Sequence, residues 1–554
     1  MPAINPSPNV GPGDPGHNQS VAMQLAEAFG RHGVDTVFGQ SLPSAFHLAA
    51  PHIGIRQVTY RTENAGGAMA DGYARVSNRV GVVSAQNGPA ATLLVPPLSE
   101  AYKASIPVLA LVQEVARDTV DRNAFQEINH TTLFSACAKW IRRIDRAARV
   151  EDYVDMAFVQ ATSGRPGPVV LLVPADLLDE AQAAADRRTI SLGRYPQDRT
   201  QPDADRVAEA ARLLAEAERP LVIAGGGVHL SDASAALSAL QEDCHLPVAT
   251  TAMGKGAVAE SHGLSVGVVG YFMGEGGRTR PLRSLVTDAD VVLLVGNRTN
   301  QNGTDSWKLY PESARYIHID VDGLEIGRNY EASVRLLGDA RLTLEKLREI
   351  LLANEVGKRE SARGRVEQEI ADGRSAWEEL TRAIRTTDRE PIRPERVMAD
   401  VDDRIDADAI IVADASYASI WVANYLTAKR AGMRFITPRG LAGLGWGLPL
   451  AIGAKMAAPG RKVVCLTGDG GFAHAWAELE TLKRLHLDIP VIVLNNQILA
   501  YQKDAEDVIF GVHTDAVDFE PVDHAALARA CGCDGVRIEH AKDLAPAIDQ
   551  ALAL

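Results

Sequence analysis

The chain has 554 residues, 46% of them hydrophobic and 23% charged, with a formal net charge of −14. This length exceeds what one hydrophobic core supports and predicts about three or four domains. The acidic balance argues against a nucleic-acid partner, and the odd, low number of five cysteines argues against a disulfide framework. No apolar run approaches the roughly 18 residues of a membrane-spanning helix, so we expect no membrane partner.

Residues 1–18 are rich in Pro, Gly and Asn and predict a flexible arm. The segment lacks the basic region and apolar stretch of a signal peptide, which favours a cytoplasmic protein. We therefore expect the folded part of the chain to begin near residue 19.

Short apolar runs then recur along the chain, many of them bounded by Gly, Pro, Asp or Asn. Such runs are typical of parallel strands that are buried on both faces. Segments with helical spacing, such as 206–218, lie between them, and this alternation predicts α/β domains with doubly wound parallel sheets. The runs are 34–39, 80–85, 107–112, 168–174, 220–227, 290–296, 316–322, 409–414, 462–470 and 490–496.

Two polar stretches interrupt this alternation. Residues 186–204 show no apolar period, and residues 354–390 are highly charged. We interpret both as linkers, the second partly helical. They divide the chain into three α/β domains, which are 19–185, 205–353 and 391–554.

A phosphate and metal site is predicted where the run 462–470 ends. The turn there contains glycines that let the backbone approach a ligand, and the helix expected after it favours phosphate at its N-terminus. Asp469 within the turn and Asn496 after the next strand would meet at the same sheet edge. Carboxylate and amide oxygens beside phosphate suit Mg²⁺. The glycines are Gly468, Gly470 and Gly471.

The Gly-Asp-Gly turn and the later Asn pair, both at strand ends, resemble the thiamine-diphosphate enzymes of the acetohydroxyacid synthase type. That group includes 2-hydroxyacyl-CoA lyases and oxalyl-CoA decarboxylases. The resemblance implies thiamine diphosphate and Mg²⁺ as cofactors, with Asp469, Asn496 and the carbonyl of Ile498 holding the metal. It also implies that 19–185 binds the pyrimidine ring and 391–554 the diphosphate.

Glu63 stands in the segment YRTENAGGAMADGYAR (60–75), which resembles the strand-end glutamate and small-residue helix of this family. The resemblance implies that Glu63 hydrogen-bonds N1′ of the aminopyrimidine. The chemistry needs such a group, because the thiazolium proton must be removed near neutral pH and a carboxyl at N1′ makes the 4′-imine the base.

The same resemblance implies further pocket residues. Leu444 would support the bent cofactor from below, and the carbonyl of Gly443 would accept from its 4′-amino group. Ser416 and Tyr417 fall where the family has another diphosphate contact.

Phe125, Gln126 and Glu127 match a family segment on the substrate side of the thiazolium, although Phe125 could equally be core. Gln497 directly follows the Asn pair and is expected to face the substrate. Lys139 closes another matching segment, and for it a solvated role and a pocket role are equally open.

The central domain, 205–353, resembles a nucleotide-binding unit. ADP is the nucleotide we expect most, because the Arg-Thr-Asn start of the segment 296–307 is closer to the CoA enzymes than to the synthases; FAD is less expected. An empty scaffold remains the alternative. The residues assigned to this site are Gly225, Gly226, Arg298, Asp320 and Asp322.

The leading prediction is a 2-hydroxyacyl-CoA lyase-like enzyme, which splits a 2-hydroxyacyl-CoA thioester reversibly into formyl-CoA and an aldehyde or ketone. The alternatives are an acetolactate-synthase-like decarboxylase and carboligase, and a non-catalytic homologue that binds the cofactor. The resemblance implies a homodimer or homotetramer. The family normally finishes with a strand and a mobile lid, whereas this sequence stops at an Ala/Leu helix, so we expect that part to lie outside the given sequence.

Overall fold

The computed structural model describes residues 20–181, 188–353 and 357–553. The predicted arm, 1–18, lies outside the described residues. The chain divides into two compact units, the first up to Gln197 and the second from Asp198, except that the stretch Gly72–Asn78 groups with the second.

The first unit contains one six-stranded sheet in the order β2-β1-β3-β4-β6-β5. All neighbouring strands run parallel, as the apolar runs predict. Val82, Leu109 and Leu171 of the inner strands are buried and pack against Phe29 and Phe158 from helices on one face. The strands are β1 (Thr36–Gly39), β2 (Arg56–Val58), β3 (Gly81–Ala85), β4 (Val108–Glu114), β5 (Trp140–Arg143) and β6 (Val169–Pro174).

Helices cover this sheet because each carries one apolar stripe. In the first of them, Val21, Leu25 and Phe29 are buried, and the N-cap residue Ser20 accepts a hydrogen bond from the Met23 N–H at 3.3 Å. The helices of the first unit are α1 (Val21–Arg31), α2 (Ser44–Ala49), α3 (Glu63–Ser77), α4 (Pro89–Leu93), α5 (Val95–Ala104), α6 (His130–Phe134), α7 (Val150–Thr162) and α8 (Ala175–Leu178).

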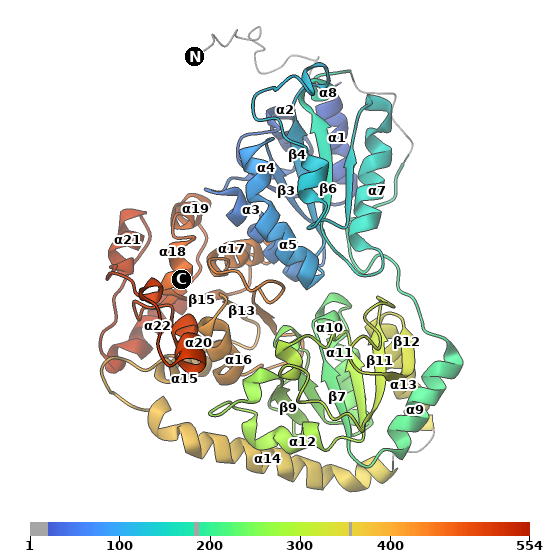
Figure 1. Cartoon of the computed structure of the whole chain (residues 1–554), viewed down its shortest axis with the longest axis vertical. Helices are drawn as coiled ribbons and strands as arrows, with labels where there is room; N and C mark the ends of the chain where they lie inside the picture. The colour runs from blue at the N-terminus through green and yellow to red at the C-terminus, as the bar shows by residue number, and fades with distance from the viewer. Residues whose placement is uncertain (1–19, 182–187, 354–356, 554) are drawn as a thin grey trace. The chain divides into compact units, whose positions relative to one another are not determined.

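The second unit contains two parallel sheets, one of six strands in the order β12-β11-β10-β7-β8-β9 and one of four in the order β14-β13-β15-β16. Together with the first unit they confirm three α/β domains with parallel sheets (Figure 1). The strands are β7 (Pro220–Ala224), β8 (Val248–Thr250), β9 (Ser265–Val268), β10 (Val291–Val295), β11 (Arg315–Asp320), β12 (Ala332–Leu337), β13 (Ile410–Ala413), β14 (Arg434–Ile436), β15 (Val463–Gly468) and β16 (Val491–Leu494).

Helices flank both sheets of the second unit, and the expected helix over 206–218 is present as the first of them. The C-terminal Ala/Leu helix is present as the last. The helices are α9 (Ala204–Glu216), α10 (Gly227–Leu230), α11 (Ser234–Asp243), α12 (Arg283–Thr287), α13 (Ala340–Ala353), α14 (Gly357–Arg385), α15 (Pro394–Arg404), α16 (Tyr417–Tyr425), α17 (Gly447–Ala457), α18 (Asp469–Ala473), α19 (Glu478–Leu485), α20 (Ala500–Phe510), α21 (His524–Ala530) and α22 (Leu544–Leu552).

Within the charged stretch predicted as a partly helical linker, Gly357–Arg385 form one long helix, α14 (Figure 1). Two buried residues of this helix belong to different cores. Ile370 packs into the cluster of the six-stranded sheet, whereas Trp377 belongs to the cluster of the four-stranded sheet. Helix α14 therefore contributes to both cores of the second unit, burying Ile370 and Trp377 while Leu380 stays exposed.

The sequence after Asp469 departs from expectation. We predicted one helix after the glycine turn, but α18 begins at Asp469 itself and a second helix, α19, begins only at Glu478. Hydrogen bonds between residues three apart, such as His474 N–H to the Gly471 carbonyl at 3.1 Å, tighten the turn between them.

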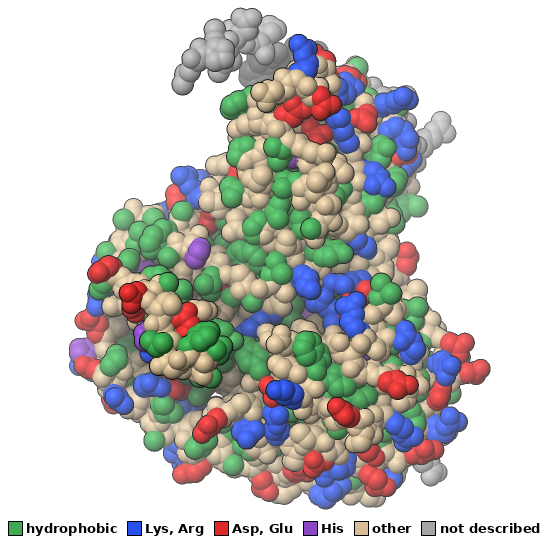
Figure 2. Space-filling view, in the orientation of Figure 1, with side chains coloured by type: hydrophobic (Ala, Val, Ile, Leu, Met, Phe, Trp, Pro, Cys, Tyr) green, Lys and Arg blue, Asp and Glu red, His purple; other side chains and the backbone are tan. Residues whose placement is uncertain are grey.

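The face shown in Figure 2 has a cluster of hydrophobic side chains over α20. Val508 is 86% exposed there and Phe510 72%. No residue of α20 is buried. The four residues of β16, at the edge of its sheet, are only half-buried.

The five cysteines are free thiols, of which Cys137, Cys244 and Cys465 are buried and Cys531 and Cys533 are partly exposed. Across the described ranges, no helix combines the length and the hydropathy that crossing a membrane requires.

Candidate active site

Strands β15 and β16 are adjacent and parallel, with Gly468 opposite Leu494. Asp469 and Asn496 follow directly after these strands, so both lie at the carboxyl edge of the sheet, as predicted. The two segments are joined there, because the N–H of Gln497 donates to Asp469 Oδ2 at 2.8 Å. Asp469 is buried.

The Asn496 side-chain amide meets two oxygen atoms at this edge. With its nitrogen toward them, the amide donates to Asp469 Oδ1 at 3.2 Å and to the carbonyl oxygen of Ile498 at 2.9 Å. The opposite orientation would place three oxygens together, which repel one another unless a cation lies between them. A hard cation would use all three oxygens as ligands.

This donor set suits Mg²⁺, because it combines one carboxylate with two neutral oxygens and leaves room for phosphate and water. Within the ranges that the structure describes, no group of three His, Cys, Asp or Glu side chains could hold a metal. The amide and the backbone carbonyl therefore distinguish this site from a soft-metal centre.

The glycines of the turn serve different purposes. A Cβ at Gly468 would meet no atom within 4 Å, so this glycine borders open space. A Cβ at Gly470 would lie 2.7 Å from Leu499, and one at Gly471 would lie 2.4 Å from Asp414 Oδ2. Gly470 and Gly471 thus permit close packing of the chain, and only Gly468 borders space for a ligand.

Asp414 is a residue that the sequence reasoning missed. Its carboxylate is buried at the end of β13 and accepts hydrogen bonds from the N–H groups of Ala415 (2.8 Å) and Gly445 (3.0 Å) and from Thr467 Oγ1 (3.2 Å). Burial raises the pKa of Asp414. The carboxylate ties the loop before α17 to β15, and its position as the acid that closes an apolar run was the available signal.

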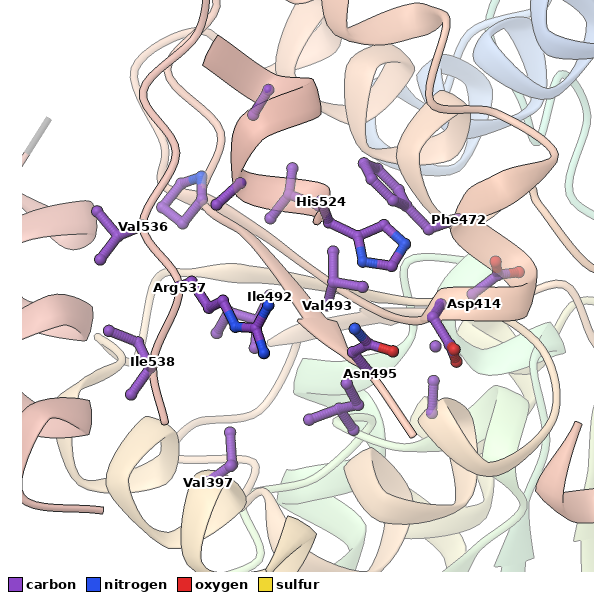
Figure 3. Close-up of a pocket in the computed structure, with 18 of the residues that line it drawn as sticks. Val397, Asp414, Phe472, Ile492, Val493, Asn495, His524, Val536, Arg537 and Ile538 are labelled. Carbon is purple, nitrogen blue, oxygen red and sulfur yellow. The ribbon is translucent and has the colours of Figure 1, made fainter. Parts of the chain in front are cut away.

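A cavity of about 1630 Å³ runs along the edge of the four-stranded sheet. Figure 3 shows β16 across its middle, with Asp414, Phe472 and His524 at one end and Arg537 and Ile538 toward the other. The cavity brings together most predicted residues of the second unit. Those that line it are Ser416, Tyr417, Leu444, Gly468, Asp469, Gly470, Gly471, Asn496, Gln497 and Ile498.

The backbone at two of these residues is strained. Ser416 has φ 64° and ψ −146°, a region that is essentially restricted to glycine, and Gln497 has φ 60°. Tyr417, the first residue of α16, donates from its hydroxyl to Asp504, and burial is the largest cause that raises its pKa. Strain of this kind persists where surrounding structure imposes it, and it is frequent at binding sites.

Leu444 is half-buried, and Gly443 precedes it in a loop that packs against Trp446, because a Cβ at Gly443 would lie 3.2 Å from that indole ring. The next residue, Gly445, has φ +87°, and a Cβ there would lie 2.3 Å from His474. The loop is therefore fixed on both sides of Leu444.

In the first unit, Glu63 is the first residue of α3 and is half-buried. The small residues that follow it are required by packing. A Cβ at Gly66 would lie 2.3 Å from the Tyr60 ring, and one at Gly67 would lie 2.5 Å from Pro97. The glutamate is thus held at a helix start that lies close against its neighbours.

The segment 125–127 has three different environments. Phe125 is 85% exposed, so it is not the core residue that was the alternative. Gln126 has φ +63°. Glu127 accepts from the N–H groups of Asp121 (2.7 Å) and Ala124 (3.0 Å), so its carboxylate closes its own loop and its catalytic role stays a prediction.

Lys139 is half-buried, and the choice between its solvated role and its pocket role stays a prediction. Its Nζ donates to the carbonyl oxygens of Ser163 (2.7 Å) and Arg165 (2.8 Å). The ammonium group therefore holds the loop before β6.

The glycines of the central domain are needed for packing. A Cβ at Gly225 would lie 2.2 Å from the Gly296 carbonyl oxygen, and one at Gly226 would lie 3.2 Å from Met253. Asp320 is buried at the end of β11 and accepts from the Asp322 N–H at 2.9 Å.

Burial raises the pKa of Asp320 to about 6, while the charge of half-buried Arg298 opposes this rise. Arg298 and the carboxylates of Asp320 and Asp322 are thus close enough to act on one another, as the nucleotide prediction requires. Their role in binding a nucleotide stays a prediction.

Comparison with protein families gives three matches along the chain. The N-terminal TPP binding domain of thiamine pyrophosphate enzymes matches residues 19–133, the central domain of these enzymes matches 207–347, and their C-terminal TPP binding domain matches 414–554. These matches fall on the three sheets.

Individual relatives match over nearly the whole chain. A probable acetolactate synthase large subunit of Methanococcus aeolicus is 32% identical over 548 residues, covering 96% of this chain and 90% of that protein. An acetolactate synthase large subunit of Parasynechococcus marenigrum is 34% identical, covering 94% and 83%. The isozyme 3 large subunit of Escherichia coli is 31% identical, covering 94% and 90%.

These relatives support the synthase alternative better than the 2-hydroxyacyl-CoA lyase that we expected first. The resemblance seen in the sequence is confirmed, and so is an enzyme of carbon–carbon bond chemistry. The chain belongs to the thiamine-diphosphate-dependent enzymes of the acetohydroxyacid synthase family.

Proposed function

We propose that this protein is an acetolactate-synthase-like carboligase that depends on thiamine diphosphate and Mg²⁺ and acts on 2-oxo acids. The observation that supports the cofactor assignment is that the Asp469 carboxylate, the Asn496 amide and the Ile498 carbonyl lie together at the sheet edge. The choice of reaction rests on relatives named acetolactate synthase that match over nearly the whole chain.

The residues would divide the work as follows. Asp469, Asn496 and the Ile498 carbonyl would hold Mg²⁺, and Leu444 would support the cofactor rings. Thiamine diphosphate, when bound, supplies a nucleophilic carbon and an electron sink for breaking or forming a bond beside a carbonyl. Glu63 would hold the proton at the pyrimidine nitrogen N1′.

In the proposed reaction, a 2-oxo acid loses its carboxylate as CO₂. Its remaining acyl unit then forms a carbon–carbon bond to the carbonyl carbon of a second 2-oxo acid, whose oxygen takes up a proton. One CO₂ leaves for each product molecule. Gln497, which lines the cavity, would donate a hydrogen bond to a substrate oxygen but cannot act as a base.

The test is turnover of 2-oxo acids beside a panel of 2-hydroxyacyl-CoA thioesters. We expect CO₂ release and a branched 2-hydroxy-3-oxo acid from the first panel. Formyl-CoA from the second panel, without carboligation, would establish the lyase instead, the second candidate that the Arg-Thr-Asn segment at 298–300 favours.

Glu63→Gln separates an enzyme from a non-catalytic homologue. We expect exchange of the thiazolium proton to slow by about 100-fold or more, because the amide cannot hold the proton at N1′. The exchange is followed by NMR on the loaded protein, with Glu63→Asp as the control that keeps the acid. Unchanged exchange in Glu63→Gln would contradict a catalytic role for this residue.

The nucleotide and the oligomer belong to the same proposal. Visible absorbance of the purified protein reports FAD, and chromatography of a heat extract reports ADP. Light scattering reports a homodimer or homotetramer. The relatives are named large subunits, so we also propose that a separate small subunit joins the assembly, for which co-purification is the test.

A further inference from the structure

Gln126 is held in a conformation that it would not adopt alone. Its φ of +63° is uncommon for a residue with a side chain. Asn87, which is buried after β3, donates from Nδ2 to the carbonyl oxygens of Phe125 (3.2 Å) and Gln126 (3.1 Å). At Gly88 a Cβ would lie 2.6 Å from the Gln126 carbonyl oxygen. The turn 87–88 therefore grips the backbone of Gln126.

His130 is hydrogen-bonded to that turn. Its ring is 2% exposed, and Nε2 lies 3.1 Å from the N–H of Gly88. Because Nε2 accepts this hydrogen bond, the ring proton of the neutral imidazole lies on Nδ1. Nδ1 is 3.1 Å from Oε1 of Glu114, and Oε2 of Glu114 forms an ion pair with Arg143 Nε at 2.8 Å. The imidazole therefore has a defined tautomer and two fixed partners.

The side chain of Gln126 is oriented by a second glutamine. Nε2 of Gln86, which is half-buried, donates to Oε1 of Gln126. This contact occupies the acceptor end of the Gln126 amide. The donor end, its NH₂ group, is then turned away from Gln86 and is the end that remains for a ligand.

We infer that Gln86, His130 and Glu114 form a positioning network that presents the NH₂ group of Gln126 to an oxygen of the substrate. The inference rests on the proposed function, in which that oxygen belongs to a 2-oxo acid. Within this network, only Gln126 touches the substrate. Gln86 sets the rotation of its amide, and His130, oriented by Glu114, sets its backbone through Gly88.

Two substitutions of His130 test the roles of its two ring nitrogens separately. His130→Gln places an acceptor near the position of Nε2 and keeps the bond from Gly88, whereas His130→Asn reaches only toward Glu114. We expect KM for the 2-oxo acid to rise on the order of tenfold in His130→Asn, the effect of one lost buried hydrogen bond. His130→Gln should restore most of it. Equal KM values in the two variants would overturn the inference.

Gln86→Glu reverses the amide. The carboxylate accepts from the Gln126 NH₂ group, so the Gln126 oxygen faces the substrate and repels its oxygen. KM for the 2-oxo acid should rise on the order of tenfold, with thiamine-diphosphate affinity unchanged. The control is Gln160→Glu, which adds the same charge at an exposed position of α7. A Gln86→Glu variant with the wild-type KM would overturn the inference.

Hydrogen exchange of residues 117–127 tests the network without turnover. Exchange should quicken in His130→Asn and not in His130→Gln. A wild-type protein that turns over no 2-oxo acid would refute the proposed function and the substrate assigned to Gln126. If turnover is present and exchange is the same in both His130 variants, the network itself is refuted while the proposed function stands.

Discussion

Single residues in this protein keep conformations and charges that reduce its stability. Ser416 is the clearest case, because its φ of 64° and ψ of −146° cost on the order of 1–3 kcal/mol for a residue with a Cβ. Ser416 lines the cavity at the sheet edge. We interpret the strain as the cost of placing its hydroxyl near the diphosphate.

Ser416→Gly should therefore stabilise the protein and weaken its binding of the cofactor. We expect the free energy of unfolding to rise by about 1 kcal/mol or more, because glycine adopts this conformation without strain. Affinity for thiamine diphosphate, measured by calorimetry, should fall. Ser416→Ala keeps the strain but removes the hydroxyl, so it should lose the affinity without the gain in stability. If Ser416→Ala bound thiamine diphosphate as tightly as the wild type does, the hydroxyl would have no binding role.

Asp320 gives a second residue-scale prediction, with a defined pH dependence. Burial raises its folded pKa to about 6 from the ordinary 3.8. A raised carboxyl pKa means that the folded state binds more protons between these values, so this group's contribution to stability decreases as pH rises from about 4 to 6. It is lowest above pH 6.

Asp320→Asn removes that cost while its amide oxygen still accepts from the Asp322 N–H. Urea unfolding should show a gain on the order of 1–3 kcal/mol at pH 7.5 and little gain at pH 4. A loss of stability at pH 7.5 would mean that the carboxylate is stabilised by its surroundings. If the carboxylate serves a nucleotide, the same variant should also release it.

At the scale of elements, α14 connects the two sheets of the second unit. Trp377 is 3% exposed, donates from Nε1 to the Gly276 carbonyl at 3.1 Å and packs against Tyr425 with ring centroids 5.3 Å apart. Gly276 belongs to the central domain and Tyr425 to the diphosphate domain. One side chain of the helix thus contributes to both.

Trp377→Ala should lower the free energy of unfolding by about 3–5 kcal/mol, through the cavity and the unpaired carbonyl that it leaves. Leu380→Ala on the same helix is the matched control, because Leu380 is 70% exposed and the change should stay within about 0.5 kcal/mol. Equal effects of the two substitutions in urea titrations would show that α14 does not connect the domains.

The elements also show which strands are readable from sequence. Each apolar run that we selected is a strand, including the edge strand β16. The strands that we missed are the other sheet edges, β2, β5, β9, β12 and β14, and β8 beside an edge. Inner strands are buried on both faces and need continuous apolar residues. Edge strands such as β12, with Arg335 between Val334 and Leu336, alternate in burial and resemble other surface segments.

The same reasoning explains the site. Asp469 and Asn496 were predictable, because parallel neighbours bring strand ends together. The break between α18 and α19 was not, since every residue there tolerates a helix. Two other contacts of the site join distant segments of the chain. Asn87 donates to the Gln126 carbonyl, and Asp414 accepts from the Gly445 N–H. No local pattern reports such contacts.

At the scale of the whole molecule, cofactor binding should be coupled to folding. A ligand that binds only the folded state at 100 times its dissociation constant adds about 2.7 kcal/mol to stability. We therefore expect Mg²⁺ and thiamine diphosphate together to raise the melting temperature by several degrees, and a chelator to reverse the shift. Calcium, which binds the same kind of oxygen ligands, should substitute for Mg²⁺ in part.

Asp469→Asn tests whether this coupling depends on the predicted metal ligands. Loss of the carboxylate removes the charge that holds the cation but leaves an acceptor for the Gln497 N–H, so the cofactor-free protein should melt as the wild type does. The shift caused by Mg²⁺ and thiamine diphosphate should disappear. Because the cation links the protein to the diphosphate, thiamine diphosphate added without Mg²⁺ should not change the melting temperature of the wild type or of Asp469→Asn. A shift that survives in Asp469→Asn would place the metal elsewhere and remove the main support for the proposed site.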